Sequence, residues 1–148
     1  MEAQSDFRDL LALFNAQKVK YIVVGGYALA FHGAPRFTGD LGIFVQPNPR
    51  NARRILAALD DFGFGSIGLS AVDFENSDNV VQLGVPPVRI DVITSLTGVS
   101  WEEALSGRVK GKYGDVPVHY IGRQQFITNK RAIGRKKDLA DLEALGEE

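Results

Sequence analysis

The chain has 148 residues and no cysteine, and this absence excludes several kinds of chemistry. Disulfide bonds, cysteine-ligated zinc and thiol nucleophiles are all ruled out. Only two histidines are present, His32 and His119, and neither has a close partner that would suggest a zinc site. The sequence also lacks a Gly-x-Ser-x-Gly elbow and a Gly-x-x-x-x-Gly-Lys loop. It therefore gives no support to a serine hydrolase or a P-loop nucleotide-binding protein.

Charge of one sign and long hydrophobic runs are also missing. Lysine and arginine number 17 and acidic residues 18, for a net charge of −1, so only a local basic patch could attract nucleic acid. No apolar run could span a membrane, and the acidic, polar residues 1–9 are unlike a signal peptide. We therefore expect a cytoplasmic protein without membrane association. The hydrophobic content of 45% predicts one compact domain over residues 1–148.

Hydrophobic periodicity predicts a fold that mixes helices and strands. Helices are expected at about residues 6–17, 27–31, 51–62, 101–105, 123–132 and 137–145, and strands at 21–24, 41–45, 79–84, 88–93, 109–113 and 116–121. Ser5 or Asp6 is expected to cap the first helix. Because hairpins and helical connections alternate, the prediction is an α/β (α+β) fold with a mixed sheet flanked by helices.

The strand at residues 40–45 carries the first candidate for metal binding. Period-two alternation puts Asp40 and Gly42 on the same face. Two carboxylates at this spacing could grip the same divalent ions, an arrangement suited to metal-assisted phosphoryl chemistry. Only Asp40 is present here. For Asp40 alone, a role at the strand start, after Thr38 and Gly39, is an equal alternative.

Asp91 and the pair Gly25-Gly26 are further candidates. Asp91 lies inside the strand at residues 88–93, where a charge needs water, a partner or a metal. Taken alone, an exposed or Arg89-paired aspartate on an edge strand is the favoured interpretation. Gly25 and Gly26 join a strand to a helix, so backbone amides could approach a phosphate there. A simple turn is the favoured interpretation of that pair when it is taken alone.

The segment from residue 130 to residue 137 is rich in positive charge. It contains Lys130, Arg131, Arg135, Lys136 and Lys137. Such a cluster could bind phosphates or nucleic acid, although a solvated helix end is the simpler interpretation. The acidic residues that follow at 138, 141 and 143 suit the start of the last helix.

Three short motifs in order, with a matching tail, resemble the polymerase-beta-like nucleotidyltransferase superfamily. The motifs are residues 22–26, 40–43 and 90–92. Residues 25–28, residues 35–40 and the tail at 129–141 are similar to its small bacterial branch, which includes abortive-infection-type toxins and stand-alone proteins. The resemblance implies a mixed sheet on which metal-binding aspartates from neighbouring strands meet.

The resemblance also implies a set of site residues. Asp40 and Asp91 match the first and third metal-binding carboxylates, which hold Mg²⁺ (or Mn²⁺), and Asp91 is the expected base. Residues at or near the triphosphate are Gly25, Gly26, Arg36, Thr38, Lys130 and Arg135. Such enzymes transfer a nucleoside monophosphate from a nucleoside triphosphate to a hydroxyl acceptor, here an RNA or tRNA, a protein or a small molecule. A cognate protein partner would fit a toxin–antitoxin pair.

Gly42 departs from the family pattern, which has Asp or Glu at this position. The ligand expected to bridge both metals is therefore missing, and a loss of about 4 kcal/mol would slow the reaction on the order of a thousandfold. Three interpretations stay open: a weakened enzyme, an inactive nucleotide-binding or protein-binding member such as an antitoxin or regulatory partner, and an engineered glycine. Glycine weakens a strand interior, so packing alone gives no obvious reason for Gly42.

Overall fold

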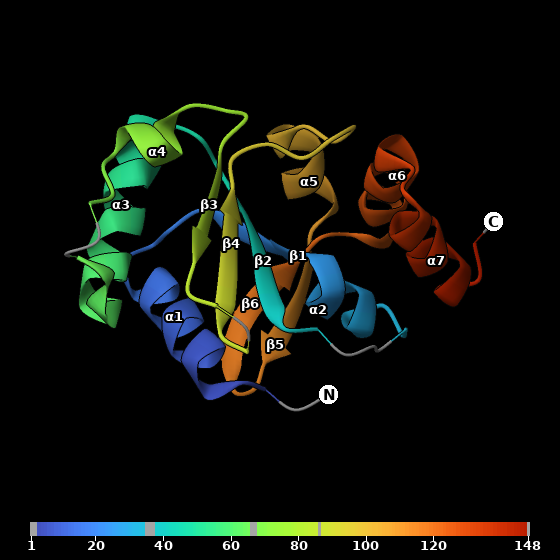
Figure 1. The fold of residues 1–148 in the computed structure, drawn as a ribbon, viewed down its shortest axis with the longest axis horizontal. Coiled ribbons are helices and arrows are strands. Elements are labelled where there is room, and N and C mark those ends of the chain that lie inside the picture. Colours follow the sequence, from blue (N-terminus) through green and yellow to red (C-terminus); the bar gives the residue numbers. More distant parts are fainter. Residues whose placement is uncertain (1–2, 35–37, 66–67, 86, 148) are drawn as a thin grey trace.

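The centre of the molecule is a six-stranded mixed sheet with the order β3-β4-β2-β1-β6-β5 (Figure 1). The structure is a computed structural model that describes residues 3–34, 38–65, 68–85 and 87–147. Its strands are β1 (Tyr21–Val24), β2 (Asp40–Val45), β3 (Val80–Leu83), β4 (Arg89–Ile93), β5 (Val109–Tyr113) and β6 (Val116–Tyr120). The pairs β2–β4 and β1–β6 are parallel, and the other neighbours are antiparallel. The predicted mixed sheet is confirmed.

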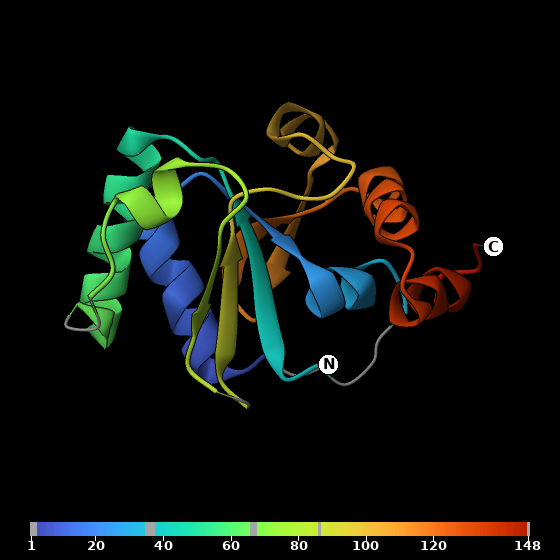
Figure 2. The same ribbon diagram turned by 45° about the horizontal axis from the view of Figure 1, so that its top comes forward.

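Helices lie on both sides of this sheet. They are α1 (Ser5–Ala16), α2 (Gly25–Phe31), α3 (Pro49–Leu59), α4 (Val72–Glu75), α5 (Trp101–Gly107), α6 (Arg123–Ile133) and α7 (Lys136–Ala144). Figure 2 shows α1, α3 and α4 on one side of strands β2, β3 and β4, and α5, α6 and α7 on the other. Among the described residues, no helix combines the length and apolar character needed to cross a bilayer.

Most element boundaries agree with the sequence predictions, and the exceptions have local causes. Helix α4 was not predicted because four residues are too few to establish a hydrophobic period. The helix predicted at residues 51–62 ends as an α-helix at Leu59. A π-helical turn, η1 (Asp60–Phe64), follows it directly and contains Gly63 at φ 109°. The prediction that Ser5 or Asp6 caps α1 is wrong, because the N-cap residue is Gln4. The side chain of Gln4 accepts hydrogen bonds from the amides of Asp6 at 2.6 Å and Phe7 at 3.1 Å, although glutamine is not among the preferred caps.

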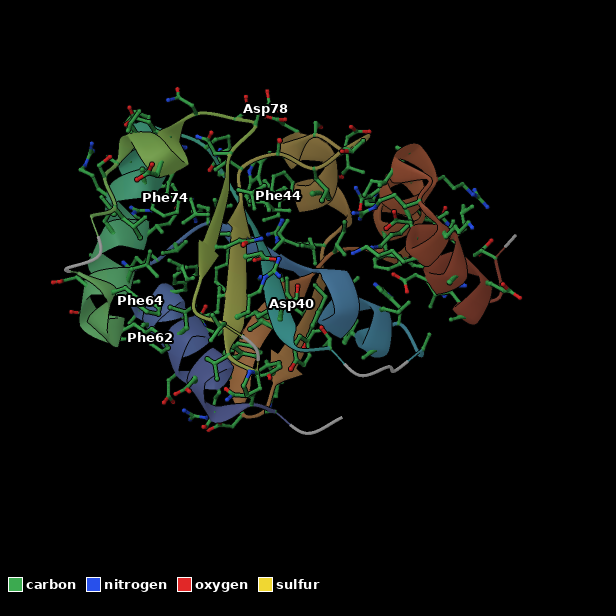
Figure 3. The ribbon with its side chains drawn as sticks, in the orientation of Figure 1. Asp40, Phe44, Phe62, Phe64, Phe74 and Asp78 are labelled. Atoms are coloured by element: carbon green, nitrogen blue, oxygen red, sulfur yellow. The ribbon has the colours of Figure 1, made fainter. Side chains whose placement is uncertain are left out.

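The two faces of β2 have different surroundings. Leu41, Ile43 and Val45 are fully buried in the main core, as period-two alternation requires. On the opposite face, the ring of Phe44 meets Trp101 of α5 edge-on, with 5.2 Å between centroids. Figure 3 shows that Asp40 lies toward the other end of the strand. Helix α5 therefore covers the Phe44 end, while the Asp40 end stays partly exposed.

Candidate active site

Strands β2 and β4 bring the two predicted metal-binding carboxylates onto one face of the sheet. In the parallel pairing of these strands, Gly42 lies opposite Asp91, and Asp40 lies opposite Arg89. Paired residues of adjacent strands point to the same face, so the α-carbons of Asp40 and Asp91 are diagonal neighbours roughly 8 Å apart. The side chains of Asp40, Arg89 and Asp91 therefore surround the bare backbone of Gly42.

Arg89 holds the carboxylate of Asp91 through two hydrogen bonds. The Arg89 Nε donates to Oδ1 at 3.0 Å and Nη2 donates to Oδ2 at 3.1 Å, while the Asp91 side chain is 17% exposed. The hydrogen bond to Asp91, the charge of Asp91 and, less strongly, the charge of Asp40 raise the pKa of Arg89. The pairing of Asp91 with Arg89 is confirmed. Its placement on an edge strand is wrong, because β4 lies between β3 and β2.

Thr38 fixes the start of β2 beside the same site. Its hydroxyl lies 3.0 Å from the carbonyl oxygen of Asp40 and 3.1 Å from Oδ1 of the same residue. A hydroxyl has one proton, so it donates to one of these oxygens at a time. The first bond holds the backbone at the start of β2, and the second holds the carboxylate of Asp40. Arg36 lies outside the described residues, and its phosphate contact stays a prediction.

Gly25 and Gly26, predicted as a turn before the helix, are the first two residues of helix α2, next to the strand that pairs with β2. They follow Val24, which pairs with Gly42. Gly25 has a φ of +73°, and a Cβ at Gly26 would lie 2.9 Å from Cβ of Thr38. Glycine at these two positions thus permits the left-handed backbone and the close approach of the Thr38 loop. The predicted contact between these residues and a phosphate is a separate matter and stays a prediction.

Gly42 has a packing partner that the sequence did not reveal. A Cβ at this position would lie 3.2 Å from Cγ2 of Val24 and 3.4 Å from its carbonyl oxygen. The first contact is tight, so a side chain at this position requires the methyl group of Val24 to shift by a few tenths of an ångström, whereas the second is an ordinary van der Waals contact. Packing therefore favours a small residue at position 42 without requiring glycine. This neighbour could not be found from the sequence, because the cross-strand partner is known only once the register is known.

Lys130 and Arg135 meet in the packing of α6 against α7. The fully buried carboxylate of Asp138 lies 3.3 Å from the Lys130 Nζ and 2.7 Å from the Arg135 Nε. Lys130 also lies 3.4 Å from Asp141 and 5.3 Å from the ring centroid of Phe126. Both cations thus have structural partners, and their predicted phosphate contacts stay predictions. From the sequence, Asp138 was interpreted only as an acidic residue at the start of the last helix. Its contact with Lys130 depends on how α6 and α7 pack after the chain turns at Gly134.

No protein-family model and no curated protein matches the chain, but several solved structures are similar to it in fold. A protein of Thermotoga maritima assigned as a nucleotidyltransferase superposes with a TM-score of 0.60 and 11% identity, covering 95% of this chain and 88% of that one. An antigenic nucleotidyltransferase-like protein of Paracoccidioides brasiliensis gives 0.55 and 18%, covering 97% and 75%. The lincosamide antibiotic adenylyltransferase LnuA, bound to lincomycin, gives 0.52 and 14%, covering 98% and 97%. The predicted nucleotidyltransferase fold is confirmed.

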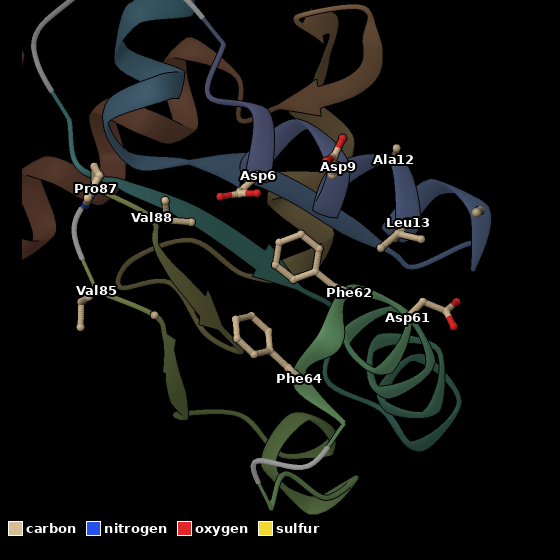
Figure 4. Close-up of a pocket in the computed structure, with 12 residues that line it drawn as sticks. Asp6, Asp9, Ala12, Leu13, Asp61, Phe62, Phe64, Val85, Pro87 and Val88 are labelled. Atoms are coloured by element: carbon tan, nitrogen blue, oxygen red, sulfur yellow. The ribbon is translucent and has the colours of Figure 1, made fainter.

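A wide groove lies elsewhere on the molecule, between α1, η1 and the β3–β4 connection (Figure 4). Its volume is about 1080 Å³, with apolar side chains such as Leu13, Phe62 and Phe64 and an acidic rim. Among the residues that the structure describes, none of those predicted to bind nucleotide or metal lines it. Across the described ranges, no group of three or more Asp, Glu or His side chains could hold a metal ion. The carboxylates of β2 and β4 therefore remain the best candidate for phosphoryl chemistry.

Asp138→Asn should destabilise the fold because it removes the negative charge that Lys130 and Arg135 share. Breaking a buried ion pair costs roughly 3 to 5 kcal/mol, and we expect about 2 to 3 kcal/mol because Asp141 still faces Lys130. Urea denaturation measures this difference in the free energy of unfolding. Glu143→Gln, at an exposed position of the same helix, is the matched control. Equal stability of the two variants would contradict the assignment.

Asp138→Asn should also change how the stability of the fold depends on pH. Burial opposes ionisation of Asp138, but hydrogen bonds from Arg135 and Lys130 outweigh it and lower its pKa below the usual 3.8. A lowered pKa stabilises the folded chain above the unfolded pKa, and this stability is lost as the pH falls through the folded pKa. The wild-type protein should therefore lose stability below about pH 4 more steeply than Asp138→Asn.

Proposed function

We propose that this protein transfers a nucleoside monophosphate from a nucleoside triphosphate to a hydroxyl acceptor, with Asp40 and Asp91 at the reacting centre. The observation that carries the proposal is their position on one face of two paired strands, beside the start of α2 at Gly25 and Gly26. The nucleotidyltransferase fold of the sheet supports it. The same face carries Arg89, so positive charge is already present where phosphates would lie.

The acceptor belongs to one of three classes: an RNA or tRNA, a protein, or a small molecule. LnuA is an adenylyltransferase for a lincosamide antibiotic, and its likeness in fold makes a small hydroxyl compound a reasonable first substrate to try. A cognate protein partner, as in a toxin–antitoxin pair, is compatible with the same site.

The donor set fits one divalent ion better than two. Carboxylate oxygens suit Mg²⁺ and Mn²⁺, and Mg²⁺ is commonly held by one or two carboxylates together with substrate phosphates. Asp40 and Asp91 would supply these carboxylates, whereas position 42 has no side chain to bridge a second ion. When bound, such an ion would neutralise the developing charge of the phosphates.

The protein residues would divide the remaining work between them. Asp40, whose carboxylate is held by the hydroxyl of Thr38, would supply one carboxylate ligand for a divalent cation. Asp91 would accept the proton of the acceptor hydroxyl as the acceptor oxygen bonds to the α-phosphorus and pyrophosphate leaves. Arg89 would first have to break at least one of its hydrogen bonds to Asp91. Its guanidinium could then donate to phosphate oxygens.

A second candidate function is nucleotide or protein binding without catalysis, as expected of an antitoxin or regulatory partner. Two observations favour it: Gly42 supplies no ligand, and Arg89 already neutralises Asp91. The two candidates differ in turnover and share the same site.

Restoring the missing carboxylate should reveal which candidate applies. Wild-type protein incubated with each labelled nucleoside triphosphate, Mg²⁺ and cell extract should label an RNA, a protein or a small molecule. Gly42→Asp should raise the rate on the order of a thousandfold if the missing ligand is worth about 4 kcal/mol. Gly42→Asn has the same shape without the charge and should give no such gain.

The tight contact with Val24 requires one precaution in this experiment. The double variant Gly42→Asp, Val24→Ala makes room for the new side chain, and its thermal melt reports on folding. Labelling by wild type supports catalysis. Nucleotide binding without turnover in wild type, with turnover in Gly42→Asp, supports the binding function. A folded Gly42→Asp variant that neither binds nor transfers any of the four nucleotides would overturn the site assignment.

Arg89 should compete with a divalent cation for Asp91, which can be measured without catalysis. We expect Arg89→Gln to strengthen Mn²⁺ binding roughly tenfold, equivalent to about 1.4 kcal/mol, and Asp40→Asn or Asp91→Asn to weaken it by as much. Electron paramagnetic resonance of free Mn²⁺ measures the change. Arg8→Gln, whose guanidinium pairs with Asp115 elsewhere, is the control. Weaker Mn²⁺ binding by Arg89→Gln would contradict competition.

A further inference from the structure

The structure has a strongly basic groove that is separate from the residues of the candidate active site. It lies between the β5–β6 hairpin, helix α5 and the segment that joins α1 to β1, and its volume is about 790 Å³. Its basic side chains are those of Lys18, Lys20, Arg108, Lys110, Lys112 and His119, and its lining contains no acidic residue from the described parts of the chain. We call this surface the basic groove.

The lysines and Arg108 of the basic groove are exposed, and Lys112 has a longer-range interaction with the charge of Asp115. In the described part of the chain, no carboxylate lies within ion-pair distance of the lysine ammonium groups at positions 18, 20, 110 and 112. The Arg108 guanidinium donates only to the carbonyl oxygen of Leu105, at 2.7 Å. Burial, together with the positive charges of Arg108 and Lys110, lowers the pKa of His119. The groove is therefore a region of concentrated positive charge.

Strand pairing explains why these cations share a surface. In the β5–β6 hairpin, Lys110 pairs with His119 and Lys112 pairs with Pro117, so these side chains point to one face. The opposite face is already occupied, because Phe31 of α2 stacks on Tyr120 with 4.2 Å between ring centroids. Lysines 110 and 112 are two positions apart in a strand, about 7 Å. Regularly spaced cations of this kind match a ligand with repeated negative charges.

Helix α5 adds an apolar wall to the positive charge. Trp101 and Leu105 line the groove, and Leu105 is 37% exposed. Proteins that bind single-stranded nucleic acid combine a positively charged groove along the phosphates with side chains that contact the bases. Here the charge is the main feature, because Trp101 is only 8% exposed and Leu105 supplies most of the accessible apolar surface of this wall. We propose that the basic groove binds single-stranded nucleic acid.

The basic groove differs from the cluster at residues 130–137 in the availability of its charges. Lys130 and Arg135 are held by Asp138, whereas the groove lysines have no such partner among the described residues. Binding in the groove also requires neither Asp40 nor Asp91. The inference therefore goes beyond the proposed function and can fail or succeed independently of it.

Fluorescence anisotropy with a labelled RNA strand of roughly 12 nucleotides tests the proposal. Five phosphate contacts predict that the logarithm of affinity falls with the logarithm of salt with a slope of about −3.5, a loss of roughly 100-fold between about 50 and 200 mM salt. Lys110→Gln with Lys112→Gln should reduce the slope to about −2. Lys136→Gln with Lys137→Gln, two exposed lysines of α7, is the matched control and should leave the slope unchanged.

Two further measurements separate the proposal from its alternatives. Lys18→Gln with Lys20→Gln should reduce the slope as much as the hairpin pair does, which guards against a local folding defect in β5. Equal losses in the groove and α7 variants, or tighter binding of a glutamate-rich peptide than of RNA, would overturn the proposal.

Discussion

The register of β2 between β1 and β4 is the constraint on which the candidate active site depends. One residue, Gly42, lies opposite Val24 on one side and Asp91 on the other. A shift by one position would turn Asp91 to the opposite face and separate it from Asp40. The same register leaves little space above Gly42, because Val24 crowds the place of a Cβ. Position 42 therefore lacks the carboxylate of the family pattern, and at the same position Val24 of β1 packs closely against β2.

Arg89 supplies a positive charge beside the carboxylates of this site. Two carboxylates on one face repel each other, and a guanidinium bound to one of them reduces that repulsion without a metal. Under the proposed function, the same guanidinium would have to release Asp91 before that carboxylate could bind a divalent cation. The Arg89–Asp91 pair would then link the local structure of β4 to that function.

Sequence reasoning reached those features that depend on neighbouring residues. Periodicity gave the strands and most helices, and alternation placed Asp40 and position 42 on one face. The meeting of Asp40 with Asp91 required the family resemblance, because strand order is not encoded locally. The Val24 contact, the Lys130–Asp138 pair and the basic groove were missed for one reason. Each of these features involves residues that are distant in the sequence and become neighbours only in the folded sheet or helix pair. Lys18 and Lys110 of the basic groove are an example.

The molecule thus presents two surfaces of different chemistry, a pair of carboxylates with the guanidinium of Arg89 and a groove lined by exposed lysines. The central claim concerns the first, and a crystal structure with a nucleoside triphosphate analogue and Mn²⁺ tests it most directly. The account predicts an anomalous peak for one ion at about 2.2 Å from oxygens of Asp40 and Asp91, with Arg89 turned toward the phosphates. A nucleotide and ion bound elsewhere, with the Arg89–Asp91 pair intact, would contradict it.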